Sequence, residues 1–361
     1  MSEFDDFTGT RVATGKHILD TNALTAWLKD NLPEFQGPVE VEMFKGGQSN
    51  PTYKLMTPSG SYVMRSKPGP LSQLLPSAHA VEREYAVMRG LTGTPVPVPR
   101  MMCLCEDESV IGRAFYLMQF MEGRVLWDPL LPGMTPLERS AIYREMNRVI
   151  AELHRVNVVQ QGLEGYGKPG NYFERQIGRW SRQYQASITQ PIPEMDALME
   201  WLPKNIPAMA RDEKMVSIVH GDFRLDNLMF DAKEAKVIAV LDWELSTLGH
   251  PLADFSYHCM AWNIPTGTFR GIGGEDLATL GIPSQEEYIR LYCERTGLVS
   301  PAQLQQDWSF YMAYNMFRIA AILQGIGKRV EAGTASSAHA IESAAGARPL
   351  AQLAWQFAQK G

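Results

Sequence analysis

The most informative stretch of the chain is Ile218-Val219-His220-Gly221-Asp222-Phe223-Arg224-Leu225-Asp226-Asn227. Within it, Asp222 and Asn227 stand five residues apart, and an apolar run that predicts a strand follows at once. The next predicted strand ends in Val240-Leu241-Asp242-Trp243-Glu244. Phosphoryl transfer needs such groups together: one carboxylate orients and deprotonates the attacking hydroxyl, while an amide oxygen and a second carboxylate hold Mg²⁺ on the nucleotide phosphates. A hairpin between Asn227 and Asp242 would place these two oxygens at the same end of a sheet.

The first third of the chain predicts a mostly antiparallel sheet with one main helix. Apolar and polar residues alternate as in strands over residues 39–43, 52–56, 61–65, 96–102 and 114–120. Apolar residues at helical spacing predict a first helix over residues 17–31 and the main helix over residues 79–91.

Beyond Met121-Glu122-Gly123 the pattern becomes helical. Helices are predicted over residues 136–156, 172–187, 194–210, 284–296 and 301–327, interrupted by a hairpin of Leu228–Phe230 and Val237–Leu241. We therefore expect an α+β, bilobal chain with a β-rich lobe (1–120), a hinge (121–123) and a larger helical lobe (124–361).

Composition excludes several classes of protein. The 361 residues include 34 Lys and Arg against 40 Asp and Glu, a net charge of −6. Binding to nucleic acid needs a concentrated basic face, so no nucleic-acid partner is expected. No apolar run approaches 18 residues and the first residues are acidic, so neither a membrane partner nor a signal peptide is expected. The four cysteines contain no C-x-x-C pair, which favours reduced thiols and a cytoplasmic location.

The ordered set of motifs resembles a known family. His220-Gly221-Asp222 with Asn227, followed by Leu241–Glu244, is similar to the aminoglycoside phosphotransferase (choline kinase-like) branch of the protein-kinase-like fold. Four longer stretches narrow the resemblance to the kinase-like domain that is fused to some acyl-CoA dehydrogenases. They are YVMRSKP (62–68), HAVEREY (79–85), HGDFRLDN (220–227) and VIAVLDWELSTLGHPLAD (237–254).

The resemblance implies ATP and Mg²⁺ as cofactors and assigns roles to individual residues. Asp222 would be the catalytic base, and Asn227 and Asp242 would be the Mg²⁺ ligands. Backbone N–H groups of one loop would cover the nucleotide phosphates, and that loop comprises Gly46, Gly47, Gln48, Ser49 and Asn50. The segment from Gln119 to Met121 would form the hinge that pairs with adenine.

Arg65 stands where protein kinases have a lysine. It could pair with the α- and β-phosphates, held by Glu84 on the helix or, failing that, by Glu82. Lys67 lies on the same strand face and competes for this role. An arginine is a planar fork rather than a point charge, and this departure argues against a protein kinase. The missing D-F-G and A-P-E motifs argue the same way.

Other polar residues have plain structural interpretations. Asp226 is expected to cap a turn. His220 is expected to hold the catalytic loop through backbone hydrogen bonds, and His154 to be a satisfied core histidine. For Asp254, the resemblance implies a buried partner of the catalytic loop, and the alternative is a helix N-cap.

The phosphate acceptor is less well defined. Arg224, two residues after the proposed base, could recognise a carboxylate, phosphate or thioester beside the acceptor hydroxyl. This favours a small, anionic, hydroxyl-bearing substrate and disfavours polycationic aminoglycosides. The resemblance suggests a hydroxyacyl-CoA.

Three further segments have a functional and a plainer alternative. Loop 267–274 could flank the acceptor or be an ordinary connection. The arginines of helix 172–187 could form an anion-binding wall or a solvated face; they are Arg175, Arg179 and Arg182. The last long helix could line the cleft or belong to the core through Trp308, Tyr311, Asn315 and Arg318.

A second hypothesis is a nucleotide-binding regulatory module without turnover, because the usual lysine is missing. The complete Asp222, Asn227 and Asp242 set counts against it. The two lobes use up the chain and leave no room for a flavin domain, so no flavin is expected.

Overall fold

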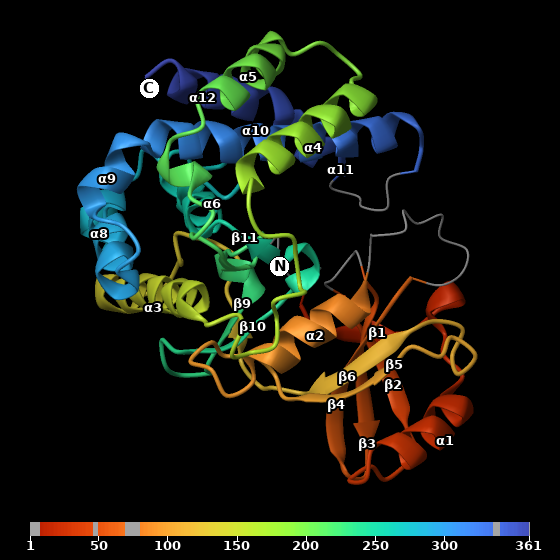
Figure 1. The fold of residues 1–361 in the computed structure, drawn as a ribbon. Coiled ribbons are helices and arrows are strands. Elements are labelled where there is room, and N and C mark those ends of the chain that lie inside the picture. Colours follow the sequence, from red (N-terminus) through yellow and green to blue (C-terminus); the bar gives the residue numbers. More distant parts are fainter. Residues whose placement is uncertain (1–7, 46–49, 69–79, 335–339, 361) are drawn as a thin grey trace. The chain divides into compact units, whose positions relative to one another are not determined.

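The computed structural model describes residues 8–45, 50–68, 80–334 and 340–360. Contacts divide the chain into two compact units. Unit 1 comprises Met1–Arg124, Met229–Lys233 and Ile238–Glu244, and unit 2 comprises Val125–Leu228, Glu234–Val237 and Leu245–Gly361. Figure 1 shows the elements, and the fold is α+β, as expected.

Unit 1 is built on a six-stranded antiparallel sheet with strand order β1-β2-β3-β4-β6-β5. The strands are β1 (Thr10–Val12), β2 (Glu40–Phe44), β3 (Thr52–Thr57), β4 (Gly60–Ser66), β5 (Met101–Cys105) and β6 (Phe115–Gln119). Four of the five strands predicted for this part of the chain are confirmed within one or two residues. The prediction of a strand over 96–102 is wrong, because β5 begins only at Met101. Pro97 and Pro99 have no N–H to donate to a ladder.

Two helices cover opposite faces of this sheet. Helix α1 (Thr21–Asn31) packs Leu24 and Leu28 into a cluster with Tyr53 and Leu55 of β3. It starts four residues later than predicted because Asp20 caps it, accepting hydrogen bonds from the N–H groups of the second and third residues of the helix. Helix α2 (Val81–Leu91) contacts β5 and β6 on the other face. This second face carries the charged residues of the site.

Short strands flank the His220–Asn227 segment and the Leu241–Glu244 segment. The predicted hairpin is confirmed as β9 (Leu228–Phe230) and β10 (Val237–Val240), in a sheet of order β10-β9-β7 with β7 (Arg124–Val125). In unit 2, β8 (Ser217–Val219) pairs antiparallel with β11 (Thr247–Gly249). The chain leaves β8 directly into the His220-Gly221-Asp222 turn.

Unit 2 is otherwise helical. Its longer helices are α3 (Pro136–Arg155), α4 (Tyr172–Ser187), α5 (Pro193–Lys204), α6 (Pro251–His258), α8 (Gln285–Thr296), α10 (Trp308–Glu331) and α12 (Ala347–Ala358). The shorter ones are α7 (Leu277–Leu280), α9 (Pro301–Gln306) and α11 (Ala340–Ala345). The predicted helix over 301–327 is two helices, α9 and α10, because the backbone of Asp307 is not helical. Helix α5 ends at Lys204, short of the predicted 210.

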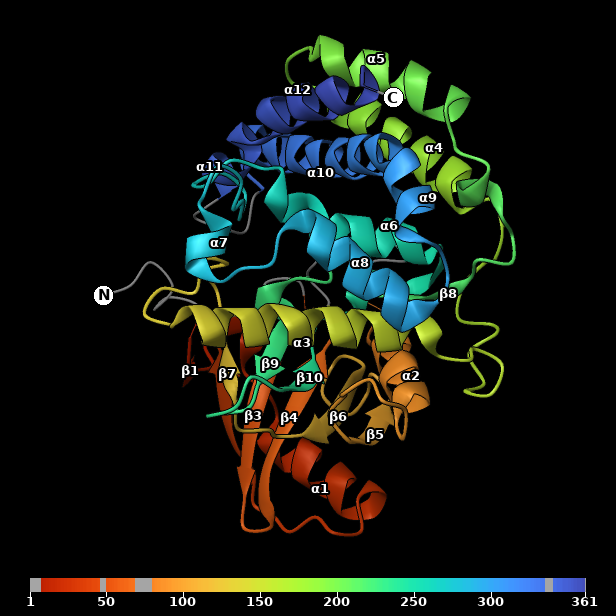
Figure 2. The same ribbon diagram turned by 90° about the vertical axis from the view of Figure 1, so that its left-hand side faces the viewer.

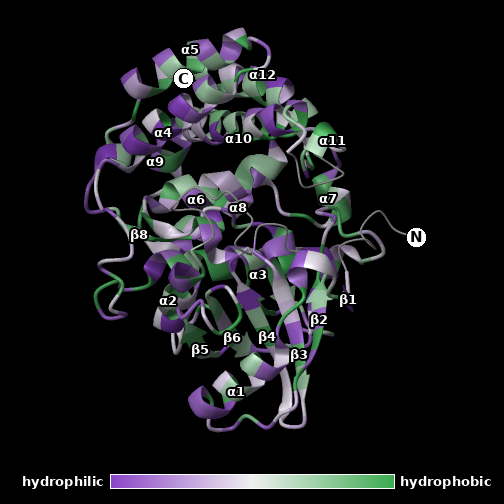
Figure 3. Ribbon diagram, turned by 90° about the vertical axis from the view of Figure 1, so that its right-hand side faces the viewer, coloured by the Kyte–Doolittle hydropathy of each residue, from purple (hydrophilic) through white to green (hydrophobic). Residues whose placement is uncertain are grey.

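Helix α10 lies at the centre of unit 2 and packs against α4, α6, α11 and α12. Figure 2 shows α4, α5, α10 and α12 beside one another, and Figure 3 shows that α5 and α12 carry both hydrophilic and hydrophobic residues. By contrast, α10 is buried on nearly all sides, including the four residues proposed as a cleft lining, Trp308, Tyr311, Asn315 and Arg318. They are core residues. None of the helices in the described ranges is long and apolar enough to cross a membrane.

Candidate active site

The His220-Gly221-Asp222 turn in unit 2 depends on its glycine. Gly221 has φ +82°, a conformation that side chains with a Cβ rarely adopt. A Cβ added there would lie 2.7 Å from the carbonyl oxygen of Leu245. The turn can therefore pass this close to the backbone of residue 245 only with glycine at position 221.

Asp254 of α6 holds the backbone of the same turn. Its carboxylate accepts hydrogen bonds from the N–H groups of His220 (2.7 Å) and Gly221 (2.8 Å). His154 Nε2 lies 3.2 Å away, and the other nitrogen of that ring contacts Tyr292 at 2.7 Å. Burial works to raise the pKa of Asp254, but its hydrogen bond with His154 and its other donors outweigh burial and hold the pKa below its usual value.

These contacts decide between the two interpretations of Asp254. The cap of α6 is His250, whose side chain accepts from the N–H of Leu252. Asp254 is therefore the buried partner of the His220-Gly221-Asp222 turn and not an N-cap. The interpretations of His154 as a core residue and of His220 as a loop-holding residue are also confirmed, since His220 Nδ1 accepts from the N–H of Asp222.

The carboxylate of Asp222 is held at both oxygens. The hydroxyl of Tyr257 in α6 donates to Oδ1. At Oδ2, Asn227 donates from Nδ2 (3.0 Å) and Arg224 Nε lies 3.1 Å away. The Asp222 side chain nevertheless stays 19% exposed, so a hydroxyl-bearing molecule can reach it.

Asp226 does not cap a turn, so that prediction is wrong. Its buried carboxylate forms ion pairs with Arg270 (2.5 Å) and Arg224 (3.5 Å). Arg270 has φ +59° and follows Phe269, which is also left-handed at φ +35°. Two adjacent non-glycine residues in this region are costly, and the ion pair with Asp226 helps to hold them. Arg270 belongs to the loop 267–274 that the sequence singled out, although its partner was not foreseen.

In unit 1, Arg65 of β4 is surrounded by carboxylates. Its guanidinium lies 3.0 Å from Glu84 of α2, 2.7 Å from Asp242 and 3.6 Å from Glu244. Burial works to lower the pKa of Arg65, but the carboxylates, Glu84 first, outweigh it and raise the pKa above its usual value. Arg65 therefore keeps its charge although it is buried.

Further donors fix Glu84, the most buried of these carboxylates. Asn50 donates to it at 2.8 Å, and Tyr116 of β6 at 3.3 Å. A second and more exposed ion pair runs alongside, from Lys67 of β4 to Glu82 of α2 at 3.1 Å. Of the two alternatives left open by the sequence, Glu84 pairs with Arg65 and Glu82 with Lys67.

The remaining residues of the predicted nucleotide site are placed only in part. Gly46, Gly47, Gln48 and Ser49 lie outside the described residues. Gln119 ends β6, and its N–H donates to the carbonyl of Arg100. Met121 follows that strand and is half-buried.

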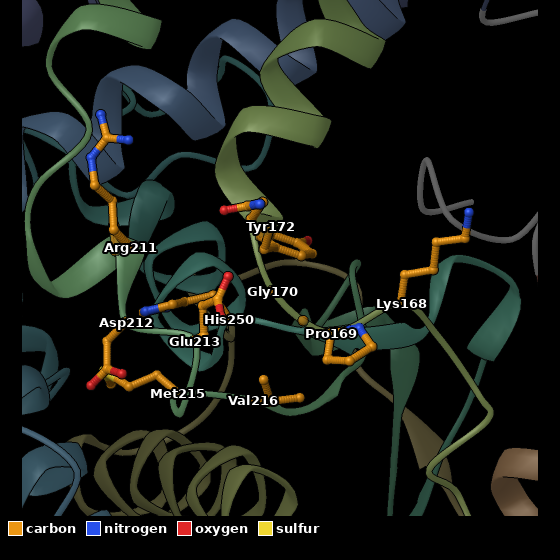
Figure 4. Close-up of a pocket in the computed structure, with 13 residues that line it drawn as sticks. Lys168, Pro169, Gly170, Tyr172, Arg211, Asp212, Glu213, Met215, Val216 and His250 are labelled. Atoms are coloured by element: carbon orange, nitrogen blue, oxygen red, sulfur yellow. The ribbon is translucent and has the colours of Figure 1, made fainter.

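A pocket elsewhere in unit 2 does not contain these residues. Figure 4 shows residues that line it, among them Lys168, Tyr172, Arg211 and His250. Within the described residues, no three His, Cys, Asp or Glu side chains come together as a metal-binding group.

Comparison with solved structures defines the class of protein. A crystal structure of a "putative aminoglycoside phosphotransferase" from Ralstonia eutropha JMP134 is 58% identical and has a TM-score of 0.86, covering 95% of this chain and 99% of that one. Choline kinase from Cryptosporidium parvum Iowa II shares the fold at 13% identity, with a TM-score of 0.64 and coverage of 94% and 96%. The fold is that of the kinase-like small-molecule phosphotransferases.

The sequence comparisons specify the family. The model of the phosphotransferase enzyme family matches residues 40–288, and the chain belongs to this family. Acyl-CoA dehydrogenase family member 10 from Mus musculus is 46% identical over 354 residues, which cover 97% of this chain and 32% of that protein. The chain thus spans about a third of the length of this relative.

Proposed function

We propose that this protein is an ATP-dependent phosphotransferase that transfers the γ-phosphoryl group to a hydroxyl of a small anionic metabolite. Family membership supports a small-molecule phosphotransferase in general. The observation that carries the specific proposal is the arrangement around Asp222, a partly exposed carboxylate held at both oxygens beside an asparagine and an arginine. A carboxylate fixed in this way can take the proton of an attacking hydroxyl.

The residues proposed for Mg²⁺ have suitable donor atoms. Asn227 uses its Nδ2 toward Asp222, at the backbone carbonyl and the carboxylate, which leaves its Oδ1 as the atom that can bind a cation. Asp242 supplies a carboxylate and has the unusual φ of +63°. Mg²⁺ commonly binds through one or two protein groups together with phosphates and water, so Asn227 and Asp242 fit it. Bound there, the ion would neutralise charge on the phosphates.

Unit 1 supplies the proposed nucleotide site. Arg65, held by Glu84, would contact the α- and β-phosphates, and the loop Gly46–Asn50 would cover them. The backbone of Gln119–Met121 would face adenine. The N–H of Gln119 is already used by Arg100, so any pairing of Gln119 itself with the base would go through its carbonyl.

For the acceptor, we propose a hydroxyacyl thioester such as a hydroxyacyl-CoA. Arg224 lies beside the proposed base, and Arg270 pairs with Asp226, which also contacts Arg224; guanidinium groups of this kind can bind a carboxylate, a phosphate or a polarised carbonyl. A polycationic aminoglycoside would be repelled by them. The relative named above is called a dehydrogenase, but the chain spans about a third of that protein, so we do not extend dehydrogenase activity to it.

The alternative is a nucleotide-binding regulatory module without turnover. Its supporting observation is that Arg65, in place of the usual lysine, is buried and occupied by Glu84 and Asp242. A pure binding module has no use for a held base such as Asp222, and for that reason we prefer the enzyme.

The deciding experiment incubates the protein with Mg·ATP and a panel of hydroxyacyl-CoAs, free hydroxy acids, sugars and choline, with products followed by ³¹P NMR. We expect ADP and a phosphate monoester from an anionic hydroxyl compound. Asp222→Ala should bind Mg·ATP normally and turn over at least ~10²-fold more slowly, as expected for loss of a general base. Tight Mg·ATP binding with no product from any acceptor would favour the regulatory module.

A further inference from the structure

The polar groups of the turn that carries Asp222 are held by buried side chains from two helices. Asp254 of α6 takes the N–H groups of His220 and Gly221. Arg318 of α10 donates from Nη2 to the carbonyl of Gly221 at 2.5 Å. A buried anion and a buried cation therefore hold the donors and the acceptor of the same turn.

Arg318 also holds the residue that reaches the carboxylate. Its guanidinium lies 5.1 Å from the ring centroid of Tyr257 and 5.7 Å from that of Trp180, both in the range of cation–π contacts. Arg318 is only 7% exposed, so water does not compete strongly for these contacts. The backbone of the turn and the ring of Tyr257 are thus set by one guanidinium.

In the hydrogen bond between Tyr257 and Asp222, the phenol is the donor and the carboxylate is the acceptor. Burial, and next the Asp222 carboxylate, raise the pKa of Tyr257 above its usual value. The phenol therefore keeps its proton at neutral pH and donates it in a hydrogen bond to Asp222 Oδ1.

The two oxygens of Asp222 differ in how much room they have for another donor. Oδ2 meets the Asn227 amide and the Arg224 guanidinium, whereas Oδ1 meets the Tyr257 hydroxyl. An ionised carboxyl oxygen can accept about two hydrogen bonds. Among the described residues, Oδ2 faces both a hydrogen bond and an ion pair, whereas Oδ1 faces a single hydrogen bond, so Oδ1 has more room for another donor.

We propose that Tyr257, supported by Arg318, is a positioning residue that turns Oδ1 of Asp222 toward the acceptor hydroxyl. The inference rests on the phosphotransferase function proposed above. In the step, the O–H bond of the acceptor breaks and its proton moves to Oδ1. The acceptor oxygen forms a bond to the γ-phosphorus, the bond from that phosphorus to the β–γ bridging oxygen breaks, and ADP leaves.

The hydroxyl of Tyr257 matters because it holds the oxygen of the carboxylate that Asn227 and Arg224 do not contact. The terminal torsion of an aspartate is broad, so without a donor at Oδ1 the group could turn about its Cβ–Cγ bond. A misplacement of about 1 Å in a reacting group can cost about 10²-fold in rate. Loss of the hydroxyl should therefore slow the chemical step without weakening the binding of ATP.

The test is Tyr257→Phe, which removes one oxygen, with Tyr143→Phe as the matched control. Tyr143 is also a buried tyrosine of unit 2, and its hydroxyl donates to the carbonyl of Pro129, away from the turn. We expect kcat to fall about 10- to 100-fold in Tyr257→Phe, with the KM for ATP within about twofold of the wild type. Tyr143→Phe should keep the wild-type kcat. A folded Tyr257→Phe protein with wild-type kcat would overturn the proposal.

A second variant and a second readout guard against misfolding or missing activity. Arg318→Lys keeps the charge but loses the fork, and it should lower kcat in the same selective way. If the wild type transfers no phosphate at all, the proposed function fails, and the positioning contact is judged from melting temperatures. Tyr257→Phe and Asp222→Asn combined should then lower the melting temperature by less than the sum of their separate effects. Strictly additive losses would overturn the contact.

Discussion

The two charged regions of this protein are built differently. In unit 1, the residues proposed to bind nucleotide pair with one another: Arg65 contacts both Glu84 and Asp242. In unit 2, the proposed base Asp222 is partly exposed, and separate buried residues hold its turn, Asp254 and Arg318 among them. In unit 1 the same residues thus hold the structure and are proposed to bind the nucleotide, whereas in unit 2 different residues hold the structure and carry the proposed chemistry. Substitutions should separate stability from activity in unit 2 and not in unit 1.

The largest expected difference concerns the two most buried carboxylates, compared as Asp254→Ala and Glu84→Ala. Asp254→Ala leaves two backbone N–H groups and His154 without their acceptor, and backbone groups cannot turn toward water. We expect it to lower the free energy of unfolding by about 3–5 kcal/mol. Glu84→Ala also removes the acceptor of Asn50 and Tyr116, but these are side-chain donors that can turn, and Arg65 keeps Asp242 and Glu244, so the expected loss is only about 1–3 kcal/mol.

Urea unfolding of the two variants checks this comparison. Asp254→Asn is the matched control, because it keeps one acceptor oxygen and should lose less than the alanine variant. Equal losses for Asp254→Ala and Glu84→Ala would mean that the two units do not differ in the way described.

The second difference is in the response to acid, and it arises from two buried histidines of unit 2. Burial lowers the pKa of both His250 and His258 to about 4, from 6.5 in the unfolded chain. Between these values the unfolded state binds more protons than the folded state, so the free energy of unfolding rises with pH and falls on acidification. At pH 5 each histidine should lower the free energy of unfolding by about 2 kcal/mol relative to its value at pH 7.5.

Unfolding at pH 7.5 and pH 5 measures this effect, and His258→Gln supplies the control. The variant lacks one titrating group, so its stability should change less with pH than that of the wild type. A wild-type stability that is flat between pH 7.5 and 5 would contradict the burial of neutral histidines in unit 2.

Much of the fold could be predicted because local patterns agree with the tertiary structure. Strands β3 and β4 and helices α2, α3, α4 and α8 all have clear periodicity and lie within a few residues of their predicted bounds. The strand β1 was missed because three residues, two of them exposed, carry no readable pattern. Helix α12 was missed although its buried residues have helical spacing: Ala347, Leu350, Ala351, Ala354 and Ala358.

The site could be predicted only where its residues form a motif. Asp222, Asn227 and Asp242 were found because they lie close in sequence to one another and to predicted strands. Tyr257 was not, since it reaches the turn from 35 residues away and spacing gives no sign of such a contact. Arg318 was singled out on the last long helix, but its contact with the turn, 97 residues away in the sequence, could not be predicted. Asp226 was misassigned for the same reason, because its partner Arg270 lies in a distant loop.

In the function proposed here, Arg65 serves nucleotide binding and Asp222 serves the chemical step. The test is to measure, for Arg65→Met and Asp222→Asn, the Mg·ATP dissociation constant by calorimetry and the turnover with the acceptor that the substrate panel identifies. Lys67→Met, which breaks the neighbouring and more exposed ion pair, is the control and should change both quantities little. We expect Arg65→Met to weaken Mg·ATP binding at least ~10-fold through loss of charge-assisted phosphate contacts. Asp222→Asn should keep the wild-type Mg·ATP affinity while turnover falls at least ~10²-fold. Near-normal turnover in Asp222→Asn, or wild-type Mg·ATP affinity in Arg65→Met, would contradict these roles.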